Sequence, residues 1–247
     1  MKTLLFRDLK IGRRADRVLL DLDTVKDGVG FVPGLHLLVA PNGYGKTTLL
    51  QTLAGILPIQ AGEARMEGGD LPAHGKKLEP EAEVLYVSEY LTFPKFIYPS
   101  EWIEFMADGR KASSDELAPW IRDFSLSPLM NRYLGRLSQG ERRKVTWLGA
   151  HVSRRPVLFL DEPLDGLDLF GIQTARRMLV EWKRQGRIMA VVAHQVSEIL
   201  DLADEVYLFR DQKLVPWTRV FPAEPAAQLP SDRFREKVLE FYSKAKE

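Results

Sequence analysis

Hydrophobic residues along the chain form short apolar runs typical of buried strands and spaced apolar positions typical of helices. Residues 18–25 and 34–40 predict two strands, and the second is almost wholly apolar. After a glycine-rich loop, apolar residues recur at helical spacing as far as Pro58, where we expect the helix to end. Shorter strands are predicted at residues 62–67 and 84–87.

The middle third of the chain changes to helical patterns, which predict a small helical insertion. One helix is indicated by the apolar positions Trp102, Ile103, Phe105 and Met106, and a second by Leu117, Trp120, Ile121 and Phe124. Ser113 and Glu116 form a capping-box pattern for the second helix, although Pro119 lies inside it.

Strand and helix patterns alternate from residue 157 onward, which predicts a mostly parallel sheet. The expected strands are residues 157–161, 187–193 and 206–210, and the expected helices are residues 171–185 and 197–202. Residues 222–230 resemble a linker, and a last helix begins at Ser231. Its apolar face (Phe234, Val238, Phe241 and Tyr242) is expected to pack on its own domain.

Composition favours an ordinary globular α/β domain. The 247 residues are 45% apolar and 28% charged, and 35 Lys and Arg balance 34 Asp and Glu. Because the net charge is close to zero, no nucleic-acid partner is expected. The absence of cysteine excludes disulfides, no apolar run approaches the roughly 20 residues of a membrane span, and nothing suggests export.

A phosphate-binding loop is predicted directly after the strand at 34–40. The residues match Gly-x-x-x-x-Gly-Lys-[Ser/Thr] except that the first position is Ala40: Ala40, Pro41, Asn42, Gly43, Tyr44, Gly45, Lys46 and Thr47. In such a loop backbone N–H groups bind phosphate, the lysine neutralises the β and γ phosphates, Thr47 ligates Mg²⁺ and Thr48 reaches the α phosphate. A plain glycine turn before a buried helix is the alternative. Ala40 fits only with a negative φ.

Two carboxylates, Asp161 and Glu162, end the apolar strand at 157–161. A phosphate-loop site needs an aspartate for the metal and a base that orients the attacking water, so Asp161 and Glu162 are assigned these roles. Alone, the pair equally fits the start of a helix.

A third segment, Leu137-Ser138-Gln139-Gly140-Glu141, precedes the acidic strand. Ser138 and Glu141 have capping-box spacing, so a well-capped helix explains the segment. A capped helix N-terminus is also an anion site, and Gly140 would let a phosphate approach closely. The two interpretations are compatible.

Together with a later histidine, these segments resemble the nucleotide-binding domain of ABC ATPases from about residue 4 to 215. The resemblance implies an α/β P-loop NTPase fold with a mostly parallel central sheet, an antiparallel β portion and a small helical subdomain. It also implies ATP and Mg²⁺ as cofactors, and a dimer in which Ser138, Gln139 and Gly140 contact the ATP of the other protomer. By the same resemblance, Asp168 belongs to the dimer-contact loop and His194 contacts the γ phosphate.

Two positions besides Ala40 depart from the family pattern. Glu89 stands where the family has a Mg²⁺-sensing glutamine; a carboxylate still ligates Mg²⁺, so Glu89 is a third metal-ligand candidate beside Thr47 and Asp161. No aromatic residue stands where the family stacks adenine, and Ile11 is near that place.

The resemblance implies an ATPase subunit that energises transport through a separate multi-span permease. It would therefore lie in the cytoplasm, on the inner face of the cell membrane, as a homodimer or with a second ABC ATPase subunit. The aromatic segment 90–98 would meet the permease or pack locally.

Residues 1–221 are expected to form the nucleotide-binding domain, with the helical subdomain at about 90–153, and residues 222–247 a linker and helix. A soluble ABC ATPase acting on a macromolecular complex is the alternative. The compact insertion resembles exporter-type subunits more than sugar importers.

Overall fold

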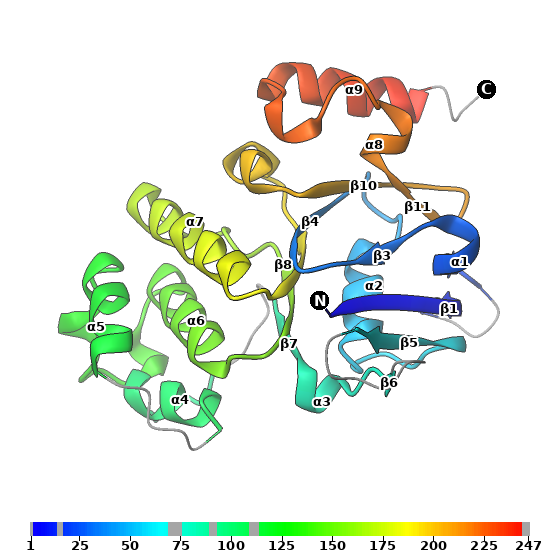
Figure 1. Ribbon diagram of the computed structural model, residues 1–247. Coiled ribbons are helices and arrows are strands. Elements are labelled where there is room, and N and C mark those ends of the chain that lie inside the picture. Colours follow the sequence, from blue (N-terminus) through cyan, green and yellow to red (C-terminus); the bar gives the residue numbers. More distant parts are fainter. Residues whose placement is uncertain (1, 14–16, 69–75, 89–92, 109–113, 244–247) are drawn as a thin grey trace.

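The computed structural model describes residues 2–13, 17–68, 76–88, 93–108 and 114–243 (Figure 1). Its strands form two sheets, and helix α2 (Lys46–Leu53) lies between them. One face of α2 buries Leu49, Leu50 and Leu53 in a core that both sheets share. The segment that begins α2 is therefore fixed on two sides.

The larger sheet has six strands, and its inner strands are buried on both faces. Their order is β11 (Lys213–Pro216), β10 (Glu205–Arg210), β4 (Gly34–Val39), β9 (Ile188–Val192), β8 (Val157–Asp161) and β7 (Val84–Val87). All neighbours are parallel except β10 and β11, which are antiparallel. This arrangement confirms the predicted, mostly parallel sheet, and it brings the carboxyl ends of β4, β8 and β9 to one edge.

The smaller sheet is antiparallel and covers the other side of α2. Its central strand β1 (Thr3–Ile11) pairs with β2 (Leu20–Leu22), β3 (Gly30–Phe31) and β5 (Ala61–Glu67), and β5 pairs with β6 (Lys76–Lys77). Two short helices flank these strands: α1 (Thr24–Asp27) joins β2 to β3 within the sheet, and α3 (Pro80–Glu83) leads from β6 to β7 of the larger sheet.

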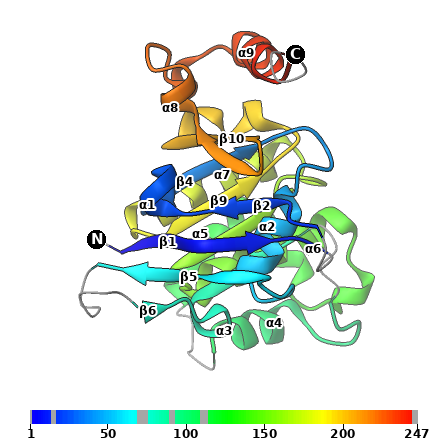
Figure 2. The ribbon, with the colours of Figure 1, turned by 90° about the vertical axis from the view of Figure 1, so that its right-hand side faces the viewer.

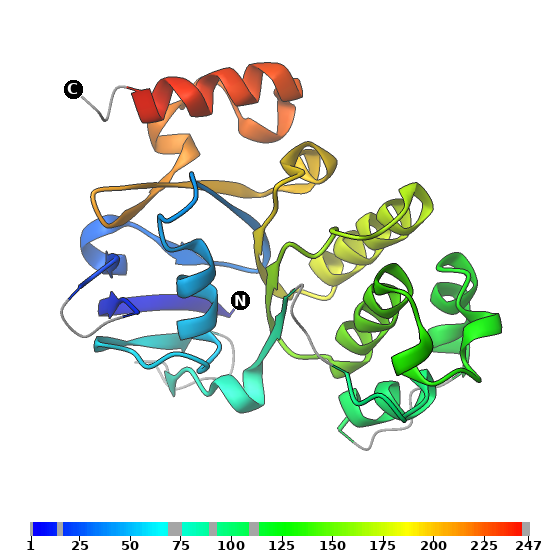
Figure 3. The ribbon, with the colours of Figure 1, turned by 180° about the vertical axis from the view of Figure 1, so that it is seen from behind.

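Four helices lie to the other side of the parallel sheet (Figures 1 and 3). They are α4 (Pro99–Met106), α5 (Ser114–Asp123), α6 (Gln139–Ser153) and α7 (Leu169–Arg184), with short 3-10 helices η1 (Ser127–Leu129) and η2 (Leu134–Arg136) between α5 and α6. The indole rings of Trp147 and Trp182 stack at 5.2 Å and join α6 to α7. Helices α4, α5 and α6 lie within the predicted helical insertion, and α7 is the separate helix predicted at residues 171–185.

The chain ends on α8 (Trp217–Val220), η5 (Ala226–Gln228) and α9 (Ser231–Ser243), which Figure 2 shows beside β10. Phe234 and Phe241 of α9 are buried in the main hydrophobic core, and Phe234 stacks on Trp217 at 5.0 Å. The prediction that this face packs on its own chain is confirmed. The division at residue 221 stays a prediction.

Some predicted boundaries were wrong for local reasons. The strand expected at 18–25 is only Leu20–Leu22, because the Asp23 side chain accepts the Lys26 N–H and starts α1. The helix expected to reach Pro58 ends at Leu53, and Gly55 follows with a φ of 76°.

Other predictions failed because the pattern was ambiguous. The helix expected at 197–202 is two 3-10 helices, η3 (Val196–Glu198) and η4 (Leu200–Leu202). Strands β1 and β11 were not predicted, and Ser113 lies outside the described residues.

Candidate active site

The loop between β4 and α2 has the backbone that phosphate binding requires. Gly43 and Gly45 adopt φ values of 86° and 96°, in the left-handed region that side chains disfavour. Ala40 is not among the described non-glycine residues with positive φ, so the predicted ordinary conformation is confirmed. Gly45 precedes the first turn of α2, whose free N–H groups suit an anion.

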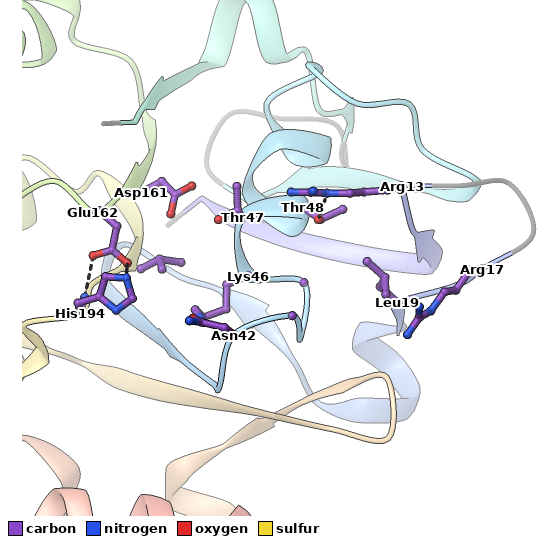
Figure 4. Close-up of a pocket in the computed structure, with 13 residues that line it drawn as sticks. Arg13, Arg17, Leu19, Asn42, Lys46, Thr47, Thr48, Asp161, Glu162 and His194 are labelled. Carbon is purple, nitrogen blue, oxygen red and sulfur yellow. Dashed lines mark hydrogen bonds and ion pairs between the residues drawn. The ribbon is translucent and has the colours of Figure 1, made fainter. Parts of the chain in front are cut away.

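A cavity of about 700 Å³ opens beside this loop (Figure 4). It brings together most of the predicted residues, and its walls are Arg13, Arg17, Leu19, Asn42, Gly43, Gly45, Lys46, Thr47, Thr48, Asp161, Glu162, Val192 and His194. The Lys46 Nζ donates to the carbonyl oxygens of Ala40, at 2.7 Å, and Pro41, at 3.2 Å. Burial lowers the pKa of Lys46, and nearby Glu162 and Asp161 oppose that effect.

Asp161, at the end of β8, is buried and receives a hydrogen bond that the sequence did not reveal. The Tyr86 hydroxyl on β7 donates to its Oδ2 at 3.0 Å. Burial first, and the charge of Asp161 second, raise the pKa of Tyr86, so the hydroxyl stays protonated as a donor. Tyr86 therefore orients the aspartate.

Glu162 has an unusual backbone and a specific partner. Its φ of 52° is rare for a residue with a side chain and is typical of functional sites. The His194 backbone N–H donates to Glu162 Oε2 at 2.7 Å, and His194 Nε2 lies 3.4 Å from Oε1. Burial raises the pKa of Glu162, while the His194 N–H counteracts the shift. The two predicted catalytic side chains thus lie in contact.

The donor set suits a Mg²⁺ ion that is shared with a nucleotide. Thr47 and Asp161 line the same cavity and offer hard oxygen atoms. Nowhere in the described part of the chain do three His, Asp or Glu side chains gather into a metal cluster. Phosphate oxygens and water would complete the shell, as Mg²⁺ prefers. Glu89 lies outside the described residues.

The segment before α6 is a complete capping box on the surface. The Ser138 Oγ accepts the Glu141 N–H at 3.2 Å, and Glu141 Oε2 accepts the Ser138 N–H at 2.6 Å. Ser138 and Gln139 are exposed, and neither they nor Gly140 line the described cavity. A Cβ on Gly140 would come within 2.5 Å of the Gly166 carbonyl oxygen, so packing within the chain already explains this glycine.

Asp168 has two partners in its own chain. Its Oδ1 accepts the Gly171 N–H at 2.7 Å and caps α7, and its Oδ2 lies 2.7 Å from Lys144 Nζ. The hydrogen bond from Lys144 lowers the pKa of Asp168. The carboxylate therefore links the start of α7 to α6.

Four of the residues that line this cavity were missed from the sequence: Arg13, Arg17, Leu19 and Val192. Arg13 Nε donates to Thr48 Oγ1 at 3.1 Å. Ile11, the residue nearest the expected adenine position, is fully buried in the core. The arginines that follow Ile11 in the sequence, Arg13 and Arg17, were the signal that could have indicated this wall of the cavity.

Comparison with known proteins matches residues 34–165, more than half of the chain, to the family described as ABC transporter. The chain belongs to the ABC transporter family. The family match and the sequence relatives show that it is an ATP-binding, ATP-hydrolysing subunit of an ABC transporter. None of its described helices is long and apolar enough to cross a membrane.

The relatives include ATP-binding proteins named for export and others named for import. The SkfA peptide export ATP-binding protein SkfE of Bacillus subtilis is 31% identical over 186 residues, 72% of this chain and 74% of that protein. The cytochrome c biogenesis ATP-binding export protein CcmA of Ruegeria pomeroyi is 35% identical over 67% of this chain and 72% of its own. The zinc transport system ATP-binding protein TroB of Treponema pallidum is 27% identical over 81% of this chain and 76% of its own.

Solved structures share the fold. An ATP-binding subunit of an ABC transporter superposes with a TM-score of 0.76 at 20% identity, covering 96% of this chain and 99% of that chain. A bacterial Atm1-family ABC exporter with ATP bound superposes with a TM-score of 0.71 at 21% identity, covering 98% of this chain and 42% of that chain.

Proposed function

We propose that two copies of this chain, or one copy and a related subunit, close around ATP and complete each other's active sites. The observation that supports this is the position of the α6 N-terminus. This N-terminus is exposed at Ser138 and Gln139, and its capping box occupies the N–H groups of Ser138 and Glu141, yet it lies outside the cavity beside Lys46. A second subunit is then the source of the missing phosphate contacts.

Within each site the residues divide the chemistry. The loop from Asn42 to Gly45 binds phosphate through its backbone N–H groups, and Lys46 leaves its carbonyl partners to neutralise the phosphates. Glu162 orients the attacking water and accepts its proton, and its raised pKa suits a base. His194 holds Glu162 and contacts the γ phosphate.

Mg²⁺ would be held by the Thr47 hydroxyl and by Asp161, directly or through water. Bound there, the ion would neutralise charge that develops on the phosphates. Tyr86 would keep the Asp161 carboxylate turned toward the cavity. Asp168 and Lys144 would keep the loop after β8 in place beside α6.

We further propose that this subunit binds the cytoplasmic side of a separate membrane permease, which receives the force of dimer closure. The helical region presents the apolar side chains Phe96 and Phe105, which are 82% and 72% exposed. Phe93, by contrast, packs on Trp102 with ring centroids 4.9 Å apart. Aromatic side chains of this region therefore contribute to local packing and, in this proposal, to the contact with the permease.

Complementation between two inactive variants tests the shared site. Lys46→Ala disables the phosphate loop, and Ser138→Asp keeps a helix cap but places a charge against the partner's phosphate. A mixed dimer retains one intact site, formed by the loop of one chain and the α6 N-terminus of the other. Mixing should restore up to about a quarter of wild-type ATPase activity, since half of randomly paired dimers are mixed.

Controls separate this result from simple residual activity. Each variant alone should be inactive at the same total concentration, and a Lys46→Ala, Ser138→Asp double variant mixed with either single variant should stay inactive. Failure of the two single variants to complement each other would contradict the shared site.

A further inference from the structure

The C-terminal helix reaches the strand that leads into the phosphate loop. Tyr242, near the end of α9, accepts the Phe209 backbone N–H and donates to the Val39 carbonyl oxygen, both at 3.0 Å. Val39 is the last residue of β4, and Phe209 lies on the neighbouring strand β10. One hydroxyl group therefore links two parallel strands where β4 ends.

The linked peptide lies next to the loop's own lysine contact. Val39 immediately precedes Ala40, whose carbonyl oxygen accepts the Lys46 ammonium at 2.7 Å. Consecutive carbonyl groups are therefore held by different elements, one by α9 and one by α2. A shift of the Val39 peptide would change the direction in which the loop leaves the sheet.

Tyr242 also contacts the loop itself. Its ring meets the ring of Tyr44 edge to face, with centroids 5.5 Å apart and an interplanar angle of 74°. Tyr44 stands between Gly43 and Gly45, whose φ values are both positive, and it is 43% exposed. Because the flanking glycines have no side chains to pack, the Tyr44 ring is a side-chain anchor for this turn.

The helix that presents Tyr242 is itself firmly attached. Phe241, the residue before Tyr242, is buried and lies under the Arg210 guanidinium, 4.6 Å from the ring centroid. Burial raises the pKa of Tyr242 to about 12, so the hydroxyl stays a neutral donor at physiological pH. The hydroxyl can therefore donate to the Val39 carbonyl oxygen at neutral pH.

We propose that Tyr242 is a positioning residue that sets the phosphate loop for ATP through Val39 and Tyr44, although it contacts no nucleotide. The inference rests on the proposed role of the loop in binding ATP. It assigns to α9 a part in nucleotide affinity, beyond its packing role in the core.

Tyr242→Phe is the decisive variant, because it removes the hydroxyl and keeps the ring. Isothermal titration of the full chain with ATP, without hydrolysis, should show a Kd raised about fivefold to tenfold, because a misdirected loop weakens phosphate contacts. In steady-state assays KM should rise with kcat nearly unchanged, since the same contacts act in the ground and transition states.

Phe234→Leu is the matched control on the same helix. It removes packing from α9 at a distance from the loop, so the melting temperature should fall while the Kd for ATP stays at the wild-type value. Equal Kd values for wild type and Tyr242→Phe, with only melting temperatures lowered, would show a purely structural role and overturn the proposal.

A double-mutant cycle tests the contact with the loop independently. Tyr44→Leu should raise the Kd in the wild-type background and have little further effect beside Tyr242→Leu, because the ring contact is then already lost. Additive effects would overturn that part of the proposal. Failure of the wild-type chain to bind ATP would instead refute the loop's assigned function.

Discussion

Glu162 combines three features at one residue: a left-handed backbone, partial burial and a hydrogen bond from the next strand's loop. Each is unfavourable or restrictive for folding, and together they are typical of a group selected for chemistry. The residue scale therefore offers the most direct tests of the mechanism.

Replacing the base should separate binding from hydrolysis. Glu162→Gln keeps the side-chain shape but accepts no proton, so ATP turnover should fall by about 10² to 10⁴ while the Kd for ATP stays close to wild type. ATP should then hold the variant as a dimer, which sedimentation velocity would detect. Unchanged turnover would remove Glu162 from the role of base.

The raised pKa of Glu162 makes a signed prediction for pH. In the folded protein this carboxyl holds its proton to a higher pH than in the unfolded chain, so its contribution to stability is present in acid and lost as pH rises through the folded pKa. Melting curves should therefore show Glu162→Gln gaining stability relative to wild type as pH rises above the ordinary carboxyl range. The opposite slope would contradict the assignment. For activity, the acidic limb of the ATPase profile should lie above that range.

Tyr86 should act on the metal through Asp161. Tyr86→Phe removes one hydrogen bond to a charged group, worth about 1.5 to 3 kcal/mol, so the Mg²⁺ concentration at half-maximal ATPase activity should rise roughly tenfold. Titration of Mg²⁺ at saturating ATP measures this. The Kd for metal-free ATP serves as the control and should not change.

At the scale of elements, α6 offers a test that separates capping from phosphate contact. Ser138→Ala should lower the free energy of unfolding by about 1 kcal/mol, whereas Ser138→Asp should retain stability because aspartate also caps. Both should lose ATPase activity if this N-terminus meets a partner's phosphate. Chemical denaturation and ATP turnover, measured together, distinguish helix capping from phosphate contact. An active Ser138→Asp variant would show that Ser138 acts only as a helix cap.

Elements were predictable where the local sequence determines them. β4, β8 and β9 are nearly continuous apolar runs buried on both faces, and these runs identified them in the sequence. β1 was missed because exposed charged residues interrupt it and Asp8 adopts a positive φ of 44°, where its pairing with β5 shifts register. Residues 197–202 have helical spacing but too few residues for a stable α-helix.

The same distinction holds for the site. Each of two motifs is a continuous stretch of sequence: the loop at 40–48, and the pair Asp161 and Glu162. Their motif chemistry therefore located them. The hydroxyl of Tyr86 meets Asp161 across 75 positions of sequence, and Tyr242 meets Val39 across 203. Such contacts depend on the register of strands and the path of the last helix, which no local pattern encodes.

At the scale of the whole molecule, the proposed assembly has a kinetic signature. If the active site needs two chains, specific ATPase activity should rise with protein concentration until the dimer saturates. Dilution series of the wild-type chain at fixed ATP measure this. A specific activity independent of dilution, for a protein that sedimentation shows to be monomeric, would contradict the paired site.

The approach of Gly140 to Gly166 has a consequence for motion. Because a Cβ at Gly140 would come within 2.5 Å of the Gly166 carbonyl oxygen, the start of α6 and the loop that follows Glu162 are closely packed and cannot move nearer to each other. In the proposed dimer, the nucleotide of one subunit would displace the α6 N-terminus of the other. The contact would transmit this displacement to the loop that follows Glu162, and so to the water that Glu162 orients. ATP hydrolysis at the two sites of the proposed dimer would then be coupled through a contact that requires glycine at position 140.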